Sequence, residues 1–392
     1  MRLALLTHEP FYPPSGGGSA ELLYLVKQLT QRNHEVHIFC PEFPNSKKTA
    51  KQFSIGIHTF KGWEMNRYTR FRSIKYLLFP IFLRRMVKNV ASNIQFDLIF
   101  SQHAISSIAA GQLKTDLKVP VVMNFLDHLT GFMETWPQWR MPRFILKHLM
   151  QFELNLPKRY NADFILTVSK ELSQRFIENG FDESRVFSIN YGYDSQLFKP
   201  KQLKPKHPPT IVMHGSFDTH HLGEIATEAI FSITQLKPDV HFLFIGKKTN
   251  ALKKLVKKIH SLSPVTNISC TGFIDYKLIS EKLCEGHVGI IPYEQSSGTH
   301  CAFVAKMVEY AAVGLPVVST PLSGTKSFFV NEPTIIFSKF DGKEFAKDTI
   351  RVLNSPPQTE ASNNLTKRVA TELDWKSICN NIINHLEAIQ TC

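Results

Sequence analysis

The chain of 392 residues is 43% hydrophobic and 20% charged, a balance that is typical of globular proteins and excludes intrinsic disorder. Its net charge of +13 favours an anionic partner, and no apolar run is long enough to cross a bilayer as a helix. The first residues lack the apolar core of a signal peptide, so we expect a cytoplasmic protein. The six cysteines are scattered without metal-ligand spacing, which favours free thiols.

The first half of the chain alternates short apolar runs with helical patterns. An apolar run at Arg2–Thr7 is followed by a glycine-rich turn, a helical pattern at Ala20–Gln31 and a second apolar run at His37–Cys40. Further strands are predicted at Asp97–Phe100, Val119–Asn124 and Phe164–Val168. This alternation predicts a doubly wound parallel sheet.

A segment rich in proline and lysine, residues 197–209, separates this half from a second α/β pattern. The second pattern predicts strands at Thr210–His214, His241–Ile245, Ile268–Thr271, Val288–Pro292 and Pro316–Ser319. It predicts helices at Glu224–Leu236, Ala251–Leu262, Tyr276–Cys284, Phe303–Val313 and Trp375–Ile389. We therefore predict two Rossmann-like α/β domains, at residues 1–198 and 209–374, with a cleft between them.

The strongest chemical signal lies in the second domain, where a loop of small residues opens a helix. Free backbone N–H groups at such a helix start suit a phosphate, and Gly298 and Thr299 belong to this loop. Lys306 lies in the first helical turn, where a cation costs about 0.3–1 kcal/mol unless an anion docks beside it. Glu309 lies on the same face, and a carboxylate can accept hydrogen bonds from two ribose hydroxyls. The alternative is a plain Lys–Glu pair on a solvated helix.

This segment resembles the donor-nucleotide motif of the retaining glycosyltransferases of family four, which have the GT-B fold. Glu309 matches the second glutamate of the motif, and Gly314-Leu315-Pro316-Val317-Val318 matches the stretch after that glutamate. Lys306 matches a subgroup that reads Lys-x-x-Glu-Tyr. The resemblance implies that Glu309 holds the ribose. The first glutamate, which in the family touches the donor sugar, falls on Cys301.

Other segments carry the resemblance along nearly the whole chain. Asn190–Asp194 with Phe198 and Pro200, and Ala162–Ser169, are similar to segments of the first family domain. Cys270–Ile274 is similar to the loop whose backbone reads the base, which implies donor contacts at Phe273 and Ile274. The family also implies that the C-terminal helix, residues 375–392, crosses back to the first domain.

A glycine turn follows the first predicted strand. Gly16, Gly17 and Gly18 permit a close approach of the backbone to a ligand. The resemblance places this turn near the donor phosphates and the acceptor. A flexible loop that closes a βα unit is the alternative.

The loop that opens the second domain, with Gly215, departs from the family pattern. Ser216 and His221 stand where the family has the Arg and Lys that neutralise the diphosphate leaving group. We therefore expect Lys306 and the helix start to stabilise more of the charge that develops there. His221 contributes to this only when it is protonated.

Asp127 and His128 follow the predicted strand Val119–Asn124. The family places a His, or in some subgroups an Asp, at this strand end, so both residues are candidate catalytic residues. An Asp can take or orient the proton of the acceptor hydroxyl, whereas a His can donate to the donor sugar or a phosphate. We favour Asp127 slightly, and an Asp that caps the next helix is the alternative.

Basic and aromatic residues are interleaved over residues 63–85 and again over 136–147. Residues 51–90 hold nine Lys or Arg and one acid, so their net charge is +8. Such helices suit an anionic membrane surface, where each basic residue contributes about 1 kcal/mol. A solvated face over a core-facing aromatic stripe is the alternative, and no motif for nucleic-acid binding is present.

Together these features predict a retaining glycosyltransferase that moves a sugar from a nucleotide-sugar, UDP-linked by default and GDP-linked otherwise, to an acceptor hydroxyl. The acceptor is expected to be lipid-linked or a cell-surface polysaccharide, with the protein peripheral on the inner face of the membrane. No metal and no cofactor is expected, because no paired aspartates demand one. The replaced Glu, Arg and Lys leave a catalytically silent nucleotide-binding scaffold as one alternative, and a nucleotide-sugar epimerase is another.

Overall fold

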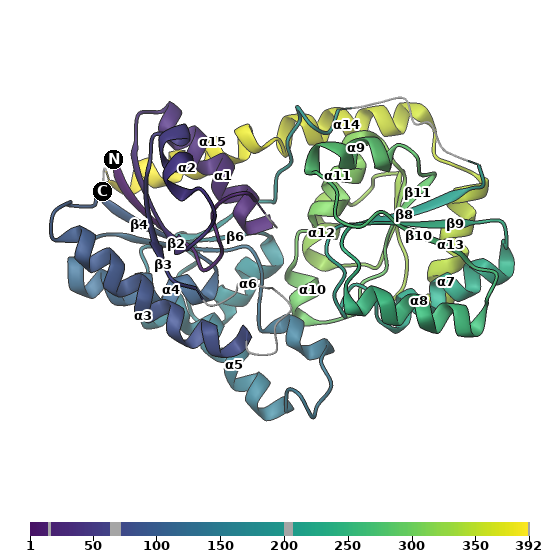
Figure 1. The fold of residues 1–392 in the computed structure, drawn as a ribbon, viewed down its shortest axis with the longest axis horizontal. Coiled ribbons are helices and arrows are strands. Elements are labelled where there is room, and N and C mark those ends of the chain that lie inside the picture. The colour runs from purple at the N-terminus through teal and green to yellow at the C-terminus, as the bar shows by residue number, and fades with distance from the viewer. Residues whose placement is uncertain (15–16, 63–71, 200–206, 391–392) are drawn as a thin grey trace. The chain divides into compact units, whose positions relative to one another are not determined.

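The structure is a computed structural model that describes residues 1–392 except 15–16, 63–71, 200–206 and 391–392 (Figure 1). Contacts divide the chain into two units. Unit 1 comprises Met1–Thr130, Phe144–Tyr191 and Trp375–Cys392, and unit 2 comprises Gly131–Arg143 and Gly192–Asp374. The predicted boundary follows residue 198, whereas the contacts place residues 192–198 and 131–143 with unit 2.

The described part of unit 1 has a parallel sheet of seven strands in the order β3-β2-β1-β4-β5-β6-β7. The strands are β1 (Arg2–Leu6), β2 (Glu35–Pro41), β3 (Gly56–Phe60), β4 (Leu98–Gln102), β5 (Val121–Phe125), β6 (Phe164–Thr167) and β7 (Val186–Ser188). Leu3 of β1 pairs with Val36 on one side and Leu98 on the other, so the strand order reverses between β1 and β4. Ligands bind outside the carboxyl ends of strands at such a switch point.

The helices of unit 1 cover the sheet and include one from the end of the chain. They are α1 (Gly17–Gln31), α2 (Ser46–Phe53), α3 (Arg72–Ala91), α4 (His103–Leu117), α5 (Arg143–Arg159), α6 (Lys170–Glu178), the 3-10 turn η2 (Glu183–Arg185) and α15 (Trp375–Gln390). Helix α15 lies beside α1 (Figure 1). Helix α1 begins three residues before the predicted start, because the glycine turn continues directly into the first helical turn.

The described part of unit 2 has six parallel strands in the order β10-β9-β8-β11-β12-β13. They are β8 (Thr210–His214), β9 (His241–Ile245), β10 (Asn267–Cys270), β11 (Val288–Ile291), β12 (Val317–Ser319) and β13 (Ile335–Phe337). The strand order reverses between β8 and β11, so this unit has a second switch point. The two parallel sheets confirm the predicted α/β class.

Eight helices of unit 2 lie in its described residues, together with a 3-10 turn, η1 (Gly131–Thr135). They are α7 (Glu224–Leu236), α8 (Asn250–Leu262), α9 (Tyr276–Leu283), α10 (Ser297–Cys301), α11 (Ala305–Val313), α12 (Ser323–Phe329), α13 (Gly342–Asn354) and α14 (Thr359–Glu372). The helix predicted at Phe303–Val313 is α11. The loop before it folds into the separate short helix α10, because Ser296 and Thr299 form a capping box.

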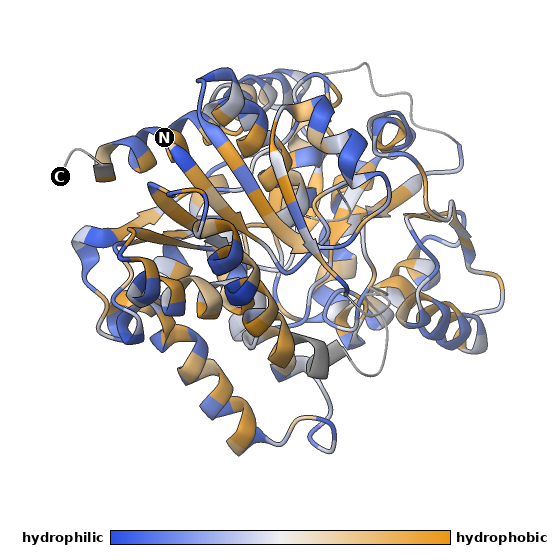
Figure 2. Cartoon of the chain, turned by 60° about the vertical axis from the view of Figure 1, so that its left-hand side comes forward, coloured by the Kyte–Doolittle hydropathy of each residue, from blue (hydrophilic) through white to orange (hydrophobic). Residues whose placement is uncertain are grey.

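The strands are largely apolar, whereas the helices mix hydrophobic and hydrophilic residues (Figure 2). The five cysteines in the described residues are free, and four of them are buried, which confirms free thiols for those five. Among the helices that the structure describes, none combines the length and the hydropathy needed to cross a membrane.

Trp375 anchors α15 to the rest of unit 1. Its ring stacks on Tyr24 of α1 with 5.6 Å between centroids and meets Tyr191 edge-on at 4.8 Å. The side chain is 2% exposed. We predict that Trp375→Ala lowers the free energy of unfolding by about 3–5 kcal/mol in urea titrations, because it leaves a large cavity. Trp139→Ala is the control, since Trp139 is 84% exposed, and equal midpoints for the two variants would refute the anchoring role.

Candidate functional site

The polar side chains of interest in unit 2 gather around its switch point. Strand β8 ends at His214, which Gly215 follows, and Tyr293 comes two residues after the end of β11. Helix α11 begins at Ala305, so Lys306 lies in its first turn and Glu309 one turn further on. The carboxyl ends of β8 and β11 thus meet a helix that carries one cation and one acid.

Glu309 is buried and held by two side chains that the sequence did not reveal. Its side chain is 8% exposed. One carboxylate oxygen contacts Nε2 of His214, and the other accepts a hydrogen bond of 2.6 Å from the hydroxyl of Tyr276. These bonds offset part of the cost of burying a carboxylate and fix its orientation. The burial argues against the alternative of a solvated Lys–Glu pair.

Lys306 reaches the loop that follows β8. Its Nζ donates to the Tyr293 hydroxyl at 2.8 Å. Gly215 has a φ of +103°, which glycine adopts without strain. A Cβ built there would lie 2.7 Å from Cε of Lys306, so glycine also leaves room for the lysine side chain. Burial and the positive charge of Lys306 lower the pKa of His220 to about 3, so His220 is neutral near pH 7.

Ser216 and His221 lie in the same loop without supplying a fixed cation. Ser216 is half-buried and His221 is 6% exposed. Nδ1 of His221 accepts a hydrogen bond of 3.1 Å from the backbone N–H of Asp218, which requires that this nitrogen be unprotonated. Protonation of this nitrogen would break the bond, so Lys306 is the better source of positive charge at this loop.

The start of α10 differs from the expected phosphate site. The Thr299 hydroxyl is used inside the capping box, and the backbone N–H of Ser297 donates to the carboxylate of Glu134 from the segment 131–143. A side chain on Gly298 would clash with the backbone of Phe132. In this structure protein oxygens therefore occupy the backbone N–H groups of Ser297 and Thr299, so this helix start offers a diphosphate fewer free donors than the sequence predicted.

Cys301, at the position of the family's first glutamate, is fully buried within α10. A side chain without exposed surface is not available to a sugar in this structure. The thiol therefore packs in the interior of unit 2 and does not take over the polar contact that the family's glutamate makes.

The loop after β10 presents Phe273 and Ile274 differently. Phe273 is 84% exposed, whereas Ile274 is half-buried. Gly272 has a φ of +76°, which permits the turn that displays Phe273. An exposed aromatic ring at a strand end is a suitable surface for stacking a base.

In unit 1 the glycine turn leads directly into α1. Gly16 lies outside the described residues, and Gly17 and Gly18 form the first turn of the helix. A Cβ on Gly18 would lie 2.6 Å from Nε2 of His103, so a larger residue does not fit there without a shift. Gly17 and Gly18, the described part of the turn, are therefore tightly packed where the sequence allowed a flexible loop.

Asp127 and His128, which follow β5, differ in exposure. His128 is fully buried, and its Nε2 lies 3.9 Å from Glu153. Glu153, which the sequence did not single out, accepts hydrogen bonds from the backbone N–H groups of Leu129 and Thr130. Asp127 is half-buried. Of the two candidate catalytic residues, Asp127 is the one with accessible surface.

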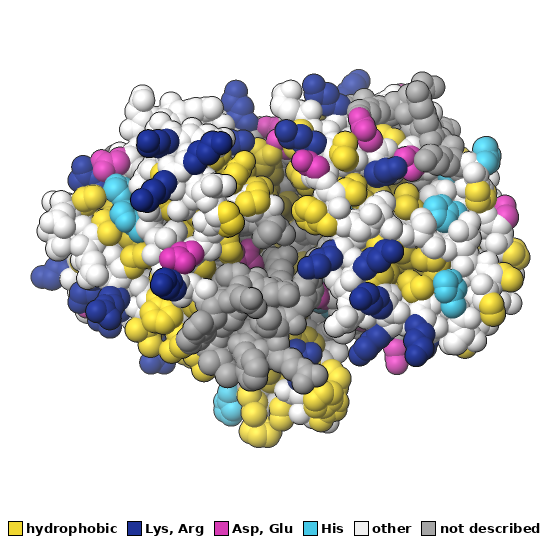
Figure 3. All heavy atoms as spheres, in the orientation of Figure 1, with side chains coloured by type: hydrophobic (Ala, Val, Ile, Leu, Met, Phe, Trp, Pro, Cys, Tyr) yellow, Lys and Arg dark blue, Asp and Glu magenta, His cyan; other side chains and the backbone are white. Residues whose placement is uncertain are grey.

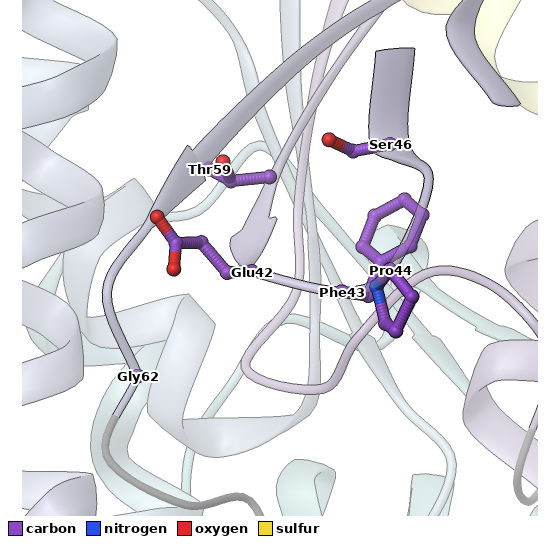
Figure 4. Close-up of a pocket in the computed structure, with 6 residues that line it drawn as sticks. All are labelled: Glu42, Phe43, Pro44, Ser46, Thr59 and Gly62. Carbon is purple, nitrogen blue, oxygen red and sulfur yellow. The ribbon is translucent and has the colours of Figure 1, made fainter. Parts of the chain in front are cut away.

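A pocket of about 470 Å³ lies beyond the carboxyl ends of β2 and β3, apart from these residues (Figure 4). Its lining comprises Glu42, Phe43, Pro44, Ser46, Thr59 and Gly62. Among the lining residues that the structure describes, the charged side chain is the acid Glu42, which does not favour a diphosphate.

Two family models match the chain. Residues 15–197 match Glycosyltransferase Family 4, and residues 208–355 match Glycosyl transferases group 1. The GPI3 subunit of the phosphatidylinositol N-acetylglucosaminyltransferase of Saccharomyces cerevisiae is 21% identical over 355 residues, which cover 88% of this chain and 73% of that protein.

Solved structures share the fold over nearly the whole chain. The sucrose-phosphate synthase of Thermosynechococcus elongatus has a TM-score of 0.79 and 17% identity, covering 99% of this chain and 98% of its own. The Anabaena protein HepE, solved in complex with UDP and glucose, has a TM-score of 0.74 and 18% identity, covering 99% of each chain. These likenesses confirm the GT-B architecture.

A substitution at Tyr276 tests whether its hydroxyl holds Glu309 in place. We predict that Tyr276→Phe lowers the free energy of unfolding by about 1–3 kcal/mol, because one oxygen of a buried carboxylate loses its partner. Tyr160→Phe is the matched control, since the Tyr160 hydroxyl bonds to none of the described residues. Denaturant titrations in which both variants unfold alike would show that the Tyr276 bond does not support Glu309.

Proposed function

We propose that this chain, which belongs to the glycosyltransferases of family four and group 1, transfers a sugar from a UDP-sugar to an acceptor hydroxyl with retention of anomeric configuration. The observation that carries the proposal is the placement of Lys306 and Glu309 on one helix beside the switch point of unit 2. A cation and an ordered carboxylate at that position suit a diphosphate and a ribose.

Glu309 binds the ribose in this proposal. Each carboxylate oxygen has more than one acceptor direction, so a ribose hydroxyl can donate to Glu309 while His214 keeps its contact. The Tyr276 hydroxyl, which now donates to the other oxygen, marks where a second ribose hydroxyl can donate instead. Replacing one O–H donor with another costs little, which supports the exchange.

Lys306 neutralises the diphosphate. Departure of the nucleotide builds negative charge on the diphosphate, and a fixed cation stabilises that charge. Lys306 is oriented by Tyr293 and lies over Gly215, in the loop where the family keeps its Arg and Lys. We include metal independence in the proposal because this lysine supplies the countercharge that the reaction needs.

UDP is the proposed nucleotide and glucose-like sugars are the first candidates. The fold neighbour HepE was solved with UDP and glucose, which supports this choice. The exposed ring of Phe273 offers a stacking surface for the base. Asp127 is the proposed group that orients or deprotonates the acceptor hydroxyl, since His128 is buried.

A lipid-linked acceptor, in glycolipid or surface-polysaccharide synthesis, fits the relative that acts on phosphatidylinositol.

The predicted basic aromatic stretch falls partly on residues outside the described part of the chain, and Phe79 is buried in the core. Exposed apolar side chains of unit 1 remain on α3 and α5: Leu77, Ile81, Phe144, Ile145 and Phe152. Figure 3 shows hydrophobic side chains gathered over α5. We propose that these helices dock on an anionic membrane surface on the cytoplasmic side.

Nucleotide binding tests the donor site. We predict that UDP and UDP-sugars raise the melting temperature and GDP does so less, because a ligand of the folded state stabilises it. Glu309→Gln should weaken UDP binding by about 10–100-fold, the effect of losing hydrogen bonds to a charged group. Glu344→Gln, at a residue of α13 whose side chain is 42% exposed, should bind as the unmodified protein does.

Turnover separates the proposal from its alternatives. The transferase proposal is supported if UDP release depends on a lipid acceptor and the transferred sugar keeps the donor's anomeric configuration. Nucleotide binding without release or transfer would instead support the silent scaffold, and no shift with any nucleotide would refute the donor site.

Membrane docking has its own test. We predict that the protein sediments with phosphatidylglycerol vesicles and much less with phosphatidylcholine vesicles, because basic residues near the apolar side chains attract anionic lipid. Arg85→Glu combined with Lys147→Glu should reduce sedimentation, and Lys343→Glu on α13 is the control for a charge change elsewhere. Equal binding to both vesicle types would contradict the electrostatic part of the proposal.

A further inference from the structure

A second buried carboxylate lies at the switch point of unit 1 and has no part in the proposed chemistry. Glu21 of α1 is 2% exposed. Its carboxylate accepts a hydrogen bond of 2.6 Å from the side-chain amide of Gln102, at the end of β4, and bonds of 2.8 and 3.1 Å from Asn124 of β5. An acid in such a position is too buried to touch a substrate, so its effect must pass through its partners.

Gln102 links this acid to the glycine turn. The same Nε2 that donates to Glu21 also donates to the backbone carbonyl of Gly18 at 2.9 Å. On its other side Gly18 packs closely against His103, the first residue of α4. The first turn of α1 is therefore held at the carboxyl end of β4, by Gln102 and by the residue that follows it.

Neutral groups, rather than cations, hold Glu21. Its polar contacts within the described residues are the amides of Gln102 and Asn124, and burial raises its pKa to about 7 while those amides oppose the rise. The titratable side chains that the contacts place beside the first turn of α1 include His103, which packs against Gly18, and Tyr191, which packs against Gly17. The ring of His8 lies 5.2 Å from that of His103. The acid thus changes charge in a physiological range.

We propose that Glu21 is a positioning residue: when ionised, it holds Gln102 against the carbonyl of Gly18 and so fixes the first turn of α1 at the switch point of unit 1, where sheets of this kind bind ligands. The inference rests on the proposed function for its consequence in catalysis. Both amides present N–H donors, which an ionised carboxylate accepts. A protonated carboxyl directs its own O–H toward those donors, so the contacts weaken and the turn loosens.

Ionisation of Glu21 lowers the stability of the folded protein but raises its activity. The folded-state pKa of Glu21 lies above the usual value of 4.5, so its contribution to stability is present below about pH 4.5 and is lost as pH rises through about 7. Activity changes the other way, because the ionised form makes the hydrogen bonds that order the turn. The two effects have different reference states. Stability compares the native chain with the unfolded chain, whereas the order of the turn compares the ionised native chain with the protonated native chain.

The pH profile of kcat/KM is the main test. The unmodified protein should gain about tenfold in kcat/KM between roughly pH 6 and pH 8, the effect of hydrogen bonds to a charged group. Glu21→Gln should stay at the low value with this step absent. Glu178→Gln, at an exposed residue of α6, should keep the step. A step of equal size in Glu21→Gln would overturn the proposal.

Two readouts work even if no sugar is transferred. Amide hydrogen exchange of residues 17–24, corrected for intrinsic pH effects, should slow as pH rises through about 7 in the unmodified protein and stay fast in Glu21→Gln. The free energy of unfolding should fall over the same range in the unmodified protein and less in the variant. If exchange shows the step while no nucleotide-sugar is consumed, the proposed function fails and the positioning role stands. If exchange shows no step, the positioning role fails whatever the enzyme does.

Discussion

The candidate site depends on one buried carboxylate that must be satisfied by hydrogen bonds. Glu309 lies almost without solvent in α11, and an unpaired charge there would cost several kcal/mol. His214 from the end of β8 and Tyr276 from the start of α9 meet that need. The three elements are therefore fixed relative to one another, and Lys306, one turn before Glu309, is directed at the loop that follows β8.

Each unit buries an acid at its own switch point, with different partners. A histidine and a hydroxyl hold Glu309, and two amides hold Glu21. In both cases one partner comes from a strand end, His214 of β8 and Gln102 of β4, because parallel strands bring their carboxyl ends to one edge of the sheet. The amides favour the ionised form of Glu21 while its burial favours the neutral form, which is why its pKa lies near 7.

The sequence predicted the parts of the molecule that depend on local pattern. Thr210–His214 and Glu224–Leu236 have the predicted bounds, because a continuous apolar run and a helical period define them. Strands β3, β7 and β13 were missed, since they are short and largely half-exposed. Lys306 and Glu309 were found from a motif, but their partners lie up to 95 residues away and only the fold brings them together. For the same reason the sequence could not show that Glu134 occupies the start of α10.

A crystal structure of the protein with UDP tests the central claim most directly. The account predicts ribose hydroxyls within hydrogen-bond distance of the Glu309 carboxylate and a diphosphate oxygen beside Nζ of Lys306. UDP bound at any other place, with Glu309 still enclosed by His214 and Tyr276 alone, would contradict it.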